Sequence, residues 1–250
     1  MLRRAVLVAV PAAGLVLLSG MGAAASSDPY TKGTVGYDYS YPQCGAAAPA
    51  ARFGIVGVDG GRPFNSFNSC LGAEFAAAAK TGSAGVYVNT GYDITYTDSS
   101  HTTSACASKS ALVSGDAPHQ AAWAVGCSEA EKDIAYATSQ SVSSPTGWWL
   151  DIENANSWST TDLTLNDYTI DGLVATFRAQ TSGAIGVYST PQQWAQLMGS
   201  GYHAAVDGEW HPTGQRTLRR AKSYCGSVGF SGAPIWLVQY VTTIDNDYAC

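Results

Sequence analysis

The stretch Trp148-Trp149-Leu150-Asp151-Ile152-Glu153-Asn154 joins a short apolar run to two carboxylates that stand one residue apart. Side chains of a β-strand alternate between its two faces, so Asp151 and Glu153 point to one side while Leu150 and Ile152 point to the other. The pattern predicts a strand whose end directs two acidic groups at one place. Acidic residues at a strand end can also serve solubility alone, so the flanking sequence has to distinguish the two interpretations.

Two neighbouring carboxylates do not ionise independently, because desolvation and like charge raise the pKa of at least one of them. One can then donate a proton while the other remains an anion, and glycoside hydrolysis uses such a pair. A serine or metal hydrolase is poorly supported, because the chain has no Gly-x-Ser-x-Gly and no His-Glu-x-x-His motif. We expect no metal and no cofactor. The four histidines are scattered at His101, His119, His203 and His211.

Patterns typical of strands and helices alternate on both sides of this stretch. Strands are predicted at 34–39, 53–59, 85–89, 148–153, 183–188, 204–210, 228–230 and 235–240. Helices are predicted at 71–80, from Ser128 to about Gln140, from Asn166 or Asp167 to Gln180, at 191–198 and at 213–224, and residues 90–120 as a long polar loop. Eight strands that alternate with helices, without hairpin-type turns, predict an α/β fold that is a single TIM-like (β/α) barrel.

In such a barrel the carboxyl ends of the strands meet on one face, where the binding site lies. The residues predicted there are Asp38, Asp59, Asn89, Asp151 with Glu153, Tyr188, Asp207 with Glu209, and Gln239 with Tyr240. Carboxylates and amides can pair with the hydroxyl groups of a sugar, and aromatic rings can stack on its C–H faces. This set of residues therefore favours a carbohydrate ligand.

Residues 1–25 have the parts of a secretory signal peptide: Arg3 and Arg4, an apolar middle, and the small residues Ala23 to Ala25. The apolar run is too short to predict a membrane span. We expect a secreted, extracellular protein whose barrel domain covers residues 26–250, and we expect it to be a monomer. The formal net charge of -6 becomes -8 without the two leader arginines, which disfavours nucleic acid or another polyanion as a partner.

Six cysteines follow the leader, and in an exported chain they indicate disulfides with 15 possible pairings. We favour sequential pairing, in which each bridge closes a loop of modest length and contributes about 3 kcal/mol. The expected pairs are Cys44–Cys70, Cys106–Cys127 and Cys225–Cys250.

Four motifs in this order resemble family 25 glycoside hydrolases, which are muramidases of the Chalaropsis lysozyme type. They are Gly36-Tyr37-Asp38-Tyr39-Ser40, Trp149 to Asn154, Gly186-Val187-Tyr188-Ser189-Thr190-Pro191, and Trp236 to Tyr240 followed by Ile244 to Asp247. The resemblance covers nearly the whole chain after the leader. It implies an irregular parallel barrel with part of the sheet antiparallel, and cleavage of the β-1,4 bond between N-acetylmuramic acid and N-acetylglucosamine in peptidoglycan.

The resemblance also implies roles for single residues. Glu153 would protonate the leaving oxygen, and Asp151 would stabilise the charge at the anomeric carbon or orient the acetamido group of the substrate. Asp38 matches the first aspartate of the family and Asp245 the last, with Asp247 as a rival to Asp245. The expected substrate-binding residues are Asp38, Tyr188, Asp245, Asp59 and Gln239.

The chain departs from the family at the rim of the expected groove. Val58-Asp59-Gly60-Gly61-Arg62 stands where the family usually has Lys-Ala-Thr-Glu, and Cys44 interrupts the end of the first motif. These departures leave open an alternative function, a barrel that binds carbohydrate or cell wall without cutting it or that cuts another glycan.

Overall fold

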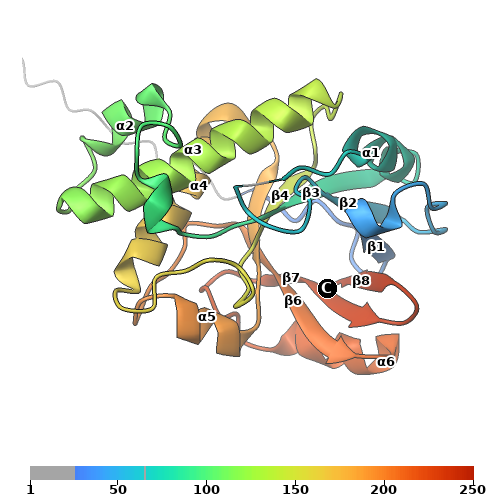
Figure 1. Ribbon diagram of the computed structural model, residues 1–250. Coiled ribbons are helices and arrows are strands. Elements are labelled where there is room, and N and C mark those ends of the chain that lie inside the picture. The colour runs from blue at the N-terminus through green and yellow to red at the C-terminus, as the bar shows by residue number, and fades with distance from the viewer. Residues whose placement is uncertain (1–25, 65) are drawn as a thin grey trace, which may run out of the picture.

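Eight strands close into one barrel within the residues that the structure describes, 26–64 and 66–250 of a computed structural model (Figure 1). The predicted signal peptide lies outside the described residues. The strands are β1 (Val35–Tyr39), β2 (Phe53–Gly57), β3 (Ser83–Asn89), β4 (Gly147–Asp151), β5 (Ala184–Tyr188), β6 (Gly208–Gln215), β7 (Ile235–Val241) and β8 (Asp245–Ala249).

Strands β1 to β7 pair in parallel with their neighbours, and β8 runs antiparallel to both β7 and β1. The predicted α/β barrel is therefore confirmed, including its antiparallel part. The strand predicted at 228–230 is wrong, because this segment is a loop in which Val228 is 91% exposed. Its place is taken by β8, whose sequence Asp-Asn-Asp-Tyr-Ala is too polar to indicate a buried strand.

Helices cover the outside of the barrel, and their bounds differ from the prediction at several points. They are α1 (Leu71–Ala79), α2 (Ser104–Ser110), α3 (Ala117–Ser139), α4 (Thr164–Gln180), α5 (Pro191–Leu197) and α6 (Leu218–Ala221), with 3-10 turns η1 (Tyr41–Gln43), η2 (Ile94–Tyr96) and η3 (Lys222–Gly226). The predicted loop 90–120 contains η2, all of α2 and the start of α3.

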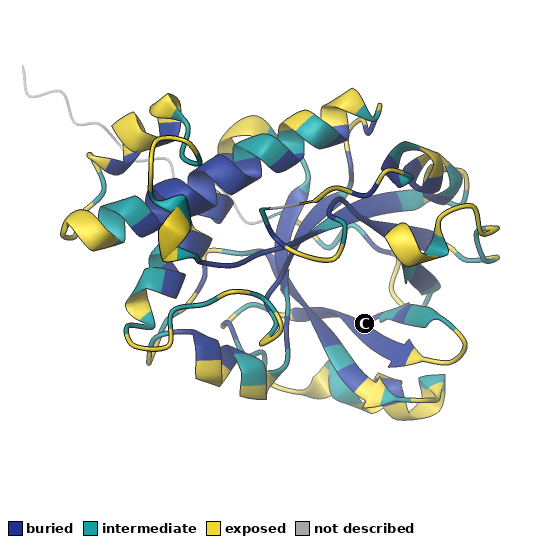
Figure 2. Cartoon of the chain, viewed as in Figure 1, coloured by how far each residue is buried: buried dark blue, intermediate teal, exposed yellow. Residues whose placement is uncertain are grey.

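Helix α3 begins eleven residues earlier than predicted. Its N-cap is Asp116, whose carboxylate accepts a hydrogen bond from the His119 backbone N–H. Ser128, the predicted start, lies inside the helix, and its hydroxyl donates to the Ala124 carbonyl at 2.7 Å. The serine is tolerated in this buried part of α3 (Figure 2) because its hydroxyl is paired: it also accepts a hydrogen bond from the Thr103 N–H at 3.0 Å.

The barrel interior is filled mainly by aromatic side chains. Trp149, Trp210 and Trp236 pack there with Phe53 and Tyr30, and the Trp149 indole N–H donates to the Tyr30 hydroxyl at 3.0 Å. A second apolar layer lies between the outer face of the sheet and helices α1, α3 and α4. The interior is therefore a packed core, as expected for an eight-stranded barrel, and a ligand can enter only above it.

All three predicted disulfides are confirmed: Cys44–Cys70, Cys106–Cys127 and Cys225–Cys250. The last bridge links η3 to the residue after β8. Among the described helices, none has the length and apolar character needed to cross a membrane.

Helices α3 and α4 cross at two glycines. A Cβ atom at Gly126 would overlap the Thr169 carbonyl oxygen, and a Cβ at Gly172 would overlap the carbonyl oxygen of Trp123. Backbone, rather than a flexible side chain, stands in the way at both positions, so the two helices can approach this closely only without side chains there.

We therefore expect Gly126→Ala and Gly172→Ala each to lower the free energy of unfolding by about 1–3 kcal/mol, because the helices must move apart. Urea denaturation measures the change. The control is Gly226→Ala, where no atom lies within 4 Å of the new Cβ; it should stay within about 0.5 kcal/mol of wild type. Equal stability of all three variants would contradict the close crossing.

Candidate active site

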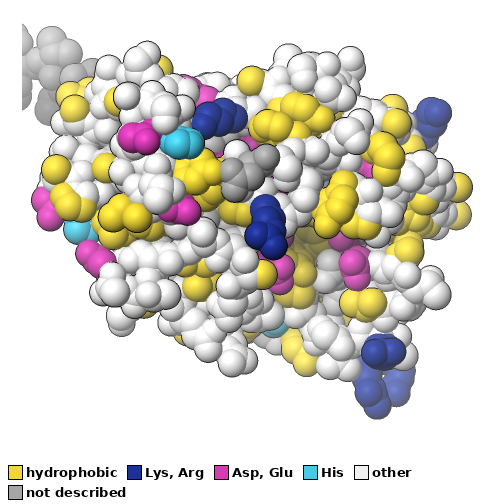
Figure 3. All heavy atoms as spheres, viewed as in Figure 1, with side chains coloured by type: hydrophobic (Ala, Val, Ile, Leu, Met, Phe, Trp, Pro, Cys, Tyr) yellow, Lys and Arg dark blue, Asp and Glu magenta, His cyan; other side chains and the backbone are white. Residues whose placement is uncertain are grey.

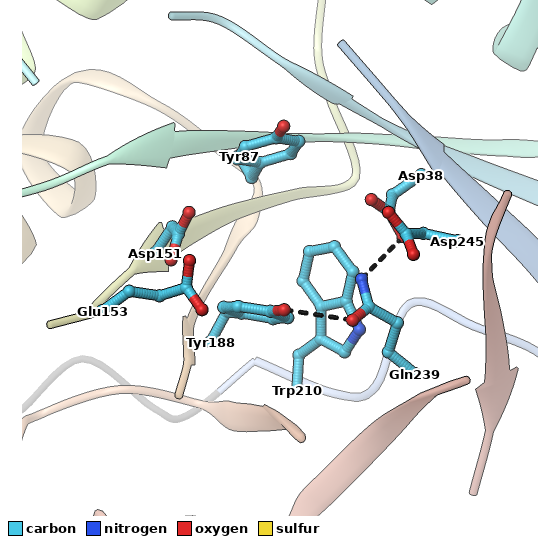
Figure 4. A pocket seen from close by; sticks show the side chains of 8 residues that line it. All are labelled: Asp38, Tyr87, Asp151, Glu153, Tyr188, Trp210, Gln239 and Asp245. Atoms are coloured by element: carbon cyan, nitrogen blue, oxygen red, sulfur yellow. Dashed lines mark hydrogen bonds between the residues drawn. The ribbon is translucent and has the colours of Figure 1, made fainter. Parts of the chain in front are cut away.

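A cavity of about 290 Å³ opens at the carboxyl ends of the strands (Figure 4). Its lining residues are Asp38, Tyr87, Asp151, Glu153, Tyr188, Trp210, Gln239 and Asp245. Six of these eight residues were predicted from the sequence. Glu153 follows β4, and the other seven come from β1, β3, β4, β5, β6, β7 and β8, so the cavity is assembled by the closure of the barrel.

Asp151 and Glu153 lie side by side on one side of the cavity (Figure 4). Asp151 is the last residue of β4, and the next residue, Ile152, is held by two hydrogen bonds to the end of β5. Its N–H donates to the Tyr188 carbonyl at 2.9 Å, and its carbonyl accepts from the Ser189 hydroxyl at 2.7 Å. The strand-like alternation is thus preserved beyond β4, and both carboxylates face the cavity.

The two carboxyl groups differ in their surroundings. Burial raises the pKa of Asp151 well above its ordinary value, and the charges of Glu153 and Asp38 add to this. Burial also raises the pKa of Glu153, against a hydrogen bond from Gln193 that lowers it. Asp151 is only 7% exposed, whereas Glu153 is partly open to solvent. The pair is therefore suited to hold a proton near neutral pH, with Glu153 as its accessible member.

The opposite side of the cavity carries Asp38 and Asp245, and a hydrogen-bonded chain connects it to Tyr188. The Tyr188 hydroxyl donates to the Gln239 amide oxygen at 3.0 Å, and the Gln239 amide nitrogen donates to Asp38 at 2.9 Å. Burial and the charge of Asp245 raise the pKa of Asp38 to about 7. The cavity thus presents two acidic groups on each side, with amide and phenol between them.

Asp247 lies beneath the cavity rather than in its lining. Its side chain is fully buried, and one carboxyl oxygen accepts a hydrogen bond of 2.8 Å from the Trp210 indole N–H. The Trp210 ring packs edge-on against Tyr188, with centroids 4.7 Å apart. Of the two aspartates that the sequence left as rivals, Asp245 is the one that faces the ligand space, while Asp247 holds the aromatic floor.

Asp59 was expected among the substrate-binding residues, but it does not line this cavity. It is 2% exposed and accepts a hydrogen bond from the Asn89 N–H at 2.6 Å. It faces a separate, small cavity that is also lined by Glu129 and Asp133 of α3. Strand β2 ends at Gly57, and Asp59 instead forms an isolated antiparallel bridge with Phe67, which lines the same small cavity.

Asp207 and Glu209 were placed at the end of a strand, which is wrong because β6 begins at Gly208. Asp207 pairs with Arg178 at 3.0 Å and also accepts from the Ile185 N–H. Glu209 is fully buried and accepts hydrogen bonds from the backbone N–H groups of Phe230 and Ser231. Both carboxylates therefore stabilise the fold below the cavity.

The sequence reasoning missed Tyr87 and Trp210. Tyr87 lies on the same face of β3 as Gly85 and Asn89, so the strand pattern did contain a signal for it. Trp210 was read as a strand end although the strand runs on to Gln215. Among the described residues, the group of potential metal ligands that lie close enough together is Cys106, Cys127 and Glu131. Its two cysteines are joined in a disulfide, so this group cannot serve as a thiolate metal site.

Several solved structures have a fold similar to that of this chain. The chain matches the muramidase from Trichobolus zukalii with a TM-score of 0.52 and 14% sequence identity, over 86% of this chain and 93% of the other. It matches GHIP, a glycosyl hydrolase 25 of Streptococcus pneumoniae, with a TM-score of 0.53 and 14% identity over 86% of each chain.

A third similar structure is the catalytic domain of an endolysin of bacteriophage P40 of Listeria monocytogenes, with a TM-score of 0.50 and 14% identity over 88% of this chain and 95% of that domain. No protein-family model and no curated protein sequence matches the chain. The barrel is therefore similar in fold to glycoside hydrolase 25 structures.

The proximity of Asp245 to Asp38 can be tested by titration. Asp245→Asn removes the like charge, so the pKa of Asp38 should fall below its value of about 7. Carboxyl carbon chemical shifts, followed by NMR against pH, measure this. Asp93→Asn, in the loop after β3, is the control and should leave Asp38 unchanged. An unchanged Asp38 titration in Asp245→Asn would show that the two charges do not interact.

The buried cluster of Asp59, Glu129 and Asp133 should make stability depend on pH. Burial raises the pKa of Asp133 to about 8, so the folded protein holds a proton that the unfolded chain releases above about pH 4. Stability is then greatest below the unfolded pKa and falls as pH rises toward 8. Between pH 5 and pH 8, the free energy of unfolding of Asp133→Asn should fall by about 1–3 kcal/mol less than that of wild type. Urea denaturation at the two pH values measures this.

The matched variant for this comparison is again Asp93→Asn, which should follow the wild-type pH dependence. If Asp133→Asn follows it as well, the Asp133 carboxyl is not protonated in the folded protein.

Proposed function

We propose that this chain is a glycoside hydrolase of peptidoglycan that acts as an N-acetylmuramidase and cleaves the β-1,4 bond after N-acetylmuramic acid. The observation that carries the proposal is the Asp151–Glu153 pair, held at the end of β4 in an open, acidic cavity. The similar structures include a protein named as a muramidase and another named as a glycosyl hydrolase 25, which supports the same chemical class.

Glu153 is the general acid in this proposal. Its raised pKa keeps it protonated closer to neutral pH, and its partial exposure lets it reach the oxygen of the leaving sugar. As the glycosidic bond breaks, positive charge develops at the anomeric carbon and the leaving oxygen takes the proton. Asp151 lies deeper and has no hydrogen-bond partner for Oδ1 among the described residues. The Asp151 carboxyl group lines the cavity, and in this proposal it orients the acetamido group of the substrate or stabilises the developing charge.

The rest of the cavity is suited to hold an amino sugar. Trp210 and Tyr188 offer aromatic surface at the floor, and Asp38, Gln239 and Asp245 offer acceptors and a donor on the far side. The connection Tyr188–Gln239–Asp38 fixes the direction of the Gln239 amide. A sugar hydroxyl there meets groups that are already oriented, which reduces the entropy lost on binding.

The same proposal places the protein outside the cell. A leader at residues 1–25 and three disulfides fit secretion into an oxidising compartment, where cell walls are accessible. We propose that the protein acts there as a monomer, because the cavity is completed within one chain. Neither a metal nor another cofactor has a role in this reaction as proposed.

We expect Glu153→Gln to reduce the clearing of purified cell walls by at least about a thousandfold, because an amide cannot donate the proton. Clearing is followed by turbidity, and the new reducing ends identify the bond that is cut. Glu131→Gln is the control, since Glu131 lies on α3 outside the cavity, and it should keep wild-type activity.

Two results would contradict the proposal. Equal clearing by wild type and Glu153→Gln would remove Glu153 from the reaction. Binding of wall fragments by wild type, with no change in glycan length after long incubation, would instead identify a barrel that binds the wall without cutting it.

A further inference from the structure

The charged side chains of this acidic protein are unevenly distributed. Residues 208–250 contain four lysines and arginines and three acidic residues, whereas residues 26–207 contain seven and sixteen. Two of the three acids, Glu209 and Asp247, are fully buried, and Asp245 faces the cavity. The exposed surface of this last part of the chain is therefore positive, although the net charge of the whole chain is negative.

The positive charge is concentrated in seven residues that follow β6. We call this cluster the basic edge; it consists of Arg216, Arg219, Arg220 and Lys222. All four side chains are exposed. In Figure 3, basic side chains gather at the lower right, at the place where Figure 1 shows α6.

None of the four cations forms an ion pair with an acidic residue in the described ranges, 26–64 and 66–250. In the described part of the chain, the ion pairs made by lysine and arginine are Lys109–Glu131 and Arg178–Asp207. Lys222 packs its ammonium group over the Tyr248 ring at 4.4 Å, which orients the charge without neutralising it. The basic edge thus keeps its charge available for an external anion.

The basic edge directly follows a strand that contributes to the cavity lining. Trp210 of β6 lines the cavity, and the same strand continues through Gln215 to the basic edge. Five residues of the strand, 211 to 215, lie between Trp210 and Arg216, so the two are at most about 20 Å apart. Pro212 of β6 also pairs with Gln239, another lining residue. A ligand on the basic edge would therefore lie beside the cavity.

We propose that the basic edge binds a flexible linear polymer of phosphodiesters. Three of its four cations are arginines, whose planar guanidinium groups match two phosphate oxygens at once. The rest of the protein carries a net negative charge, which repels a bulky polyanion, so a thin chain that touches only this edge is favoured. This goes beyond the proposed function: a wall-bound polymer of this kind would hold the protein against the wall while the cavity engages the glycan.

Two other polyanions fit the structure less well. A duplex nucleic acid is wide enough to extend beyond the basic edge, where the negative net charge of the rest of the chain repels it. A membrane surface favours an amphipathic helix that inserts apolar side chains, but α6 has four residues and buries Ala221 in the protein.

The test measures binding of poly(glycerol phosphate) by isothermal titration calorimetry, in about 50 mM and about 500 mM NaCl. Wild type should bind at low salt, and the higher salt should weaken binding at least about tenfold. Arg216→Gln, Arg219→Gln and Arg220→Gln together should weaken binding at low salt at least about tenfold. The control combines Lys32→Gln, Arg52→Gln and Lys80→Gln, which changes the net charge equally on exposed residues that precede β1, β2 and β3.

The proposal fails if wild type does not bind the polymer, or if both triple variants bind it as wild type does. It also fails if polyglutamate, duplex DNA or anionic vesicles bind as tightly as poly(glycerol phosphate), because the ligand would then not be a phosphodiester chain. The binding of Glu153→Gln should equal that of wild type. This variant separates the two proposals, since loss of wall cleavage leaves binding at the basic edge intact.

Discussion

The interior of the barrel has to be filled by side chains, and this constraint determines where a ligand can lie. Large rings fill it because glycines stand opposite them: a Cβ at Gly36 would overlap Phe53, one at Gly186 would overlap Trp149, and one at Gly208 would overlap Trp236. At each glycine, the space that a side chain would occupy is filled by an aromatic ring from a neighbouring strand. Trp210 forms the top of this packed column and the floor of the cavity.

A packed floor also explains the acidity of the cavity. Asp38 and Asp151 line the cavity above the aromatic column, and Asp247 lies beneath it beside Trp210; all three carboxyl groups are shielded from solvent. Burial is the largest cause of the raised pKa of each of these groups, ahead of the neighbouring charges. The same packing that closes the barrel thus supplies protonated carboxyl groups near neutral pH, and it does so without a basic residue in the lining.

Much of this arrangement could be predicted because it depends on local sequence. The alternation around Asp151 and Glu153 survives in the structure, and the order of strands and helices indicates the barrel. Asp59 could not be placed, because its position depends on how the chain turns toward α3. The polar strand β8 has no apolar pattern of its own and exists only because β7 and β1 offer unpaired edges. Asp207 and Glu209 were predicted at a strand end because the strand was placed at 204–210, whereas β6 begins at Gly208.

The antiparallel β8 has a consequence for how the protein folds. Asp38 and Gln239, which are hydrogen-bonded in the cavity wall, are separated by 201 positions in the chain, and β8 pairs with β1 over a similar separation in sequence. Contacts of such long range form late, because the intervening chain must first be ordered. The cavity is therefore completed at the end of folding, so a chain that has formed only β1 to β6 would carry Asp38 and the Asp151–Glu153 pair but would lack Gln239 and Asp245.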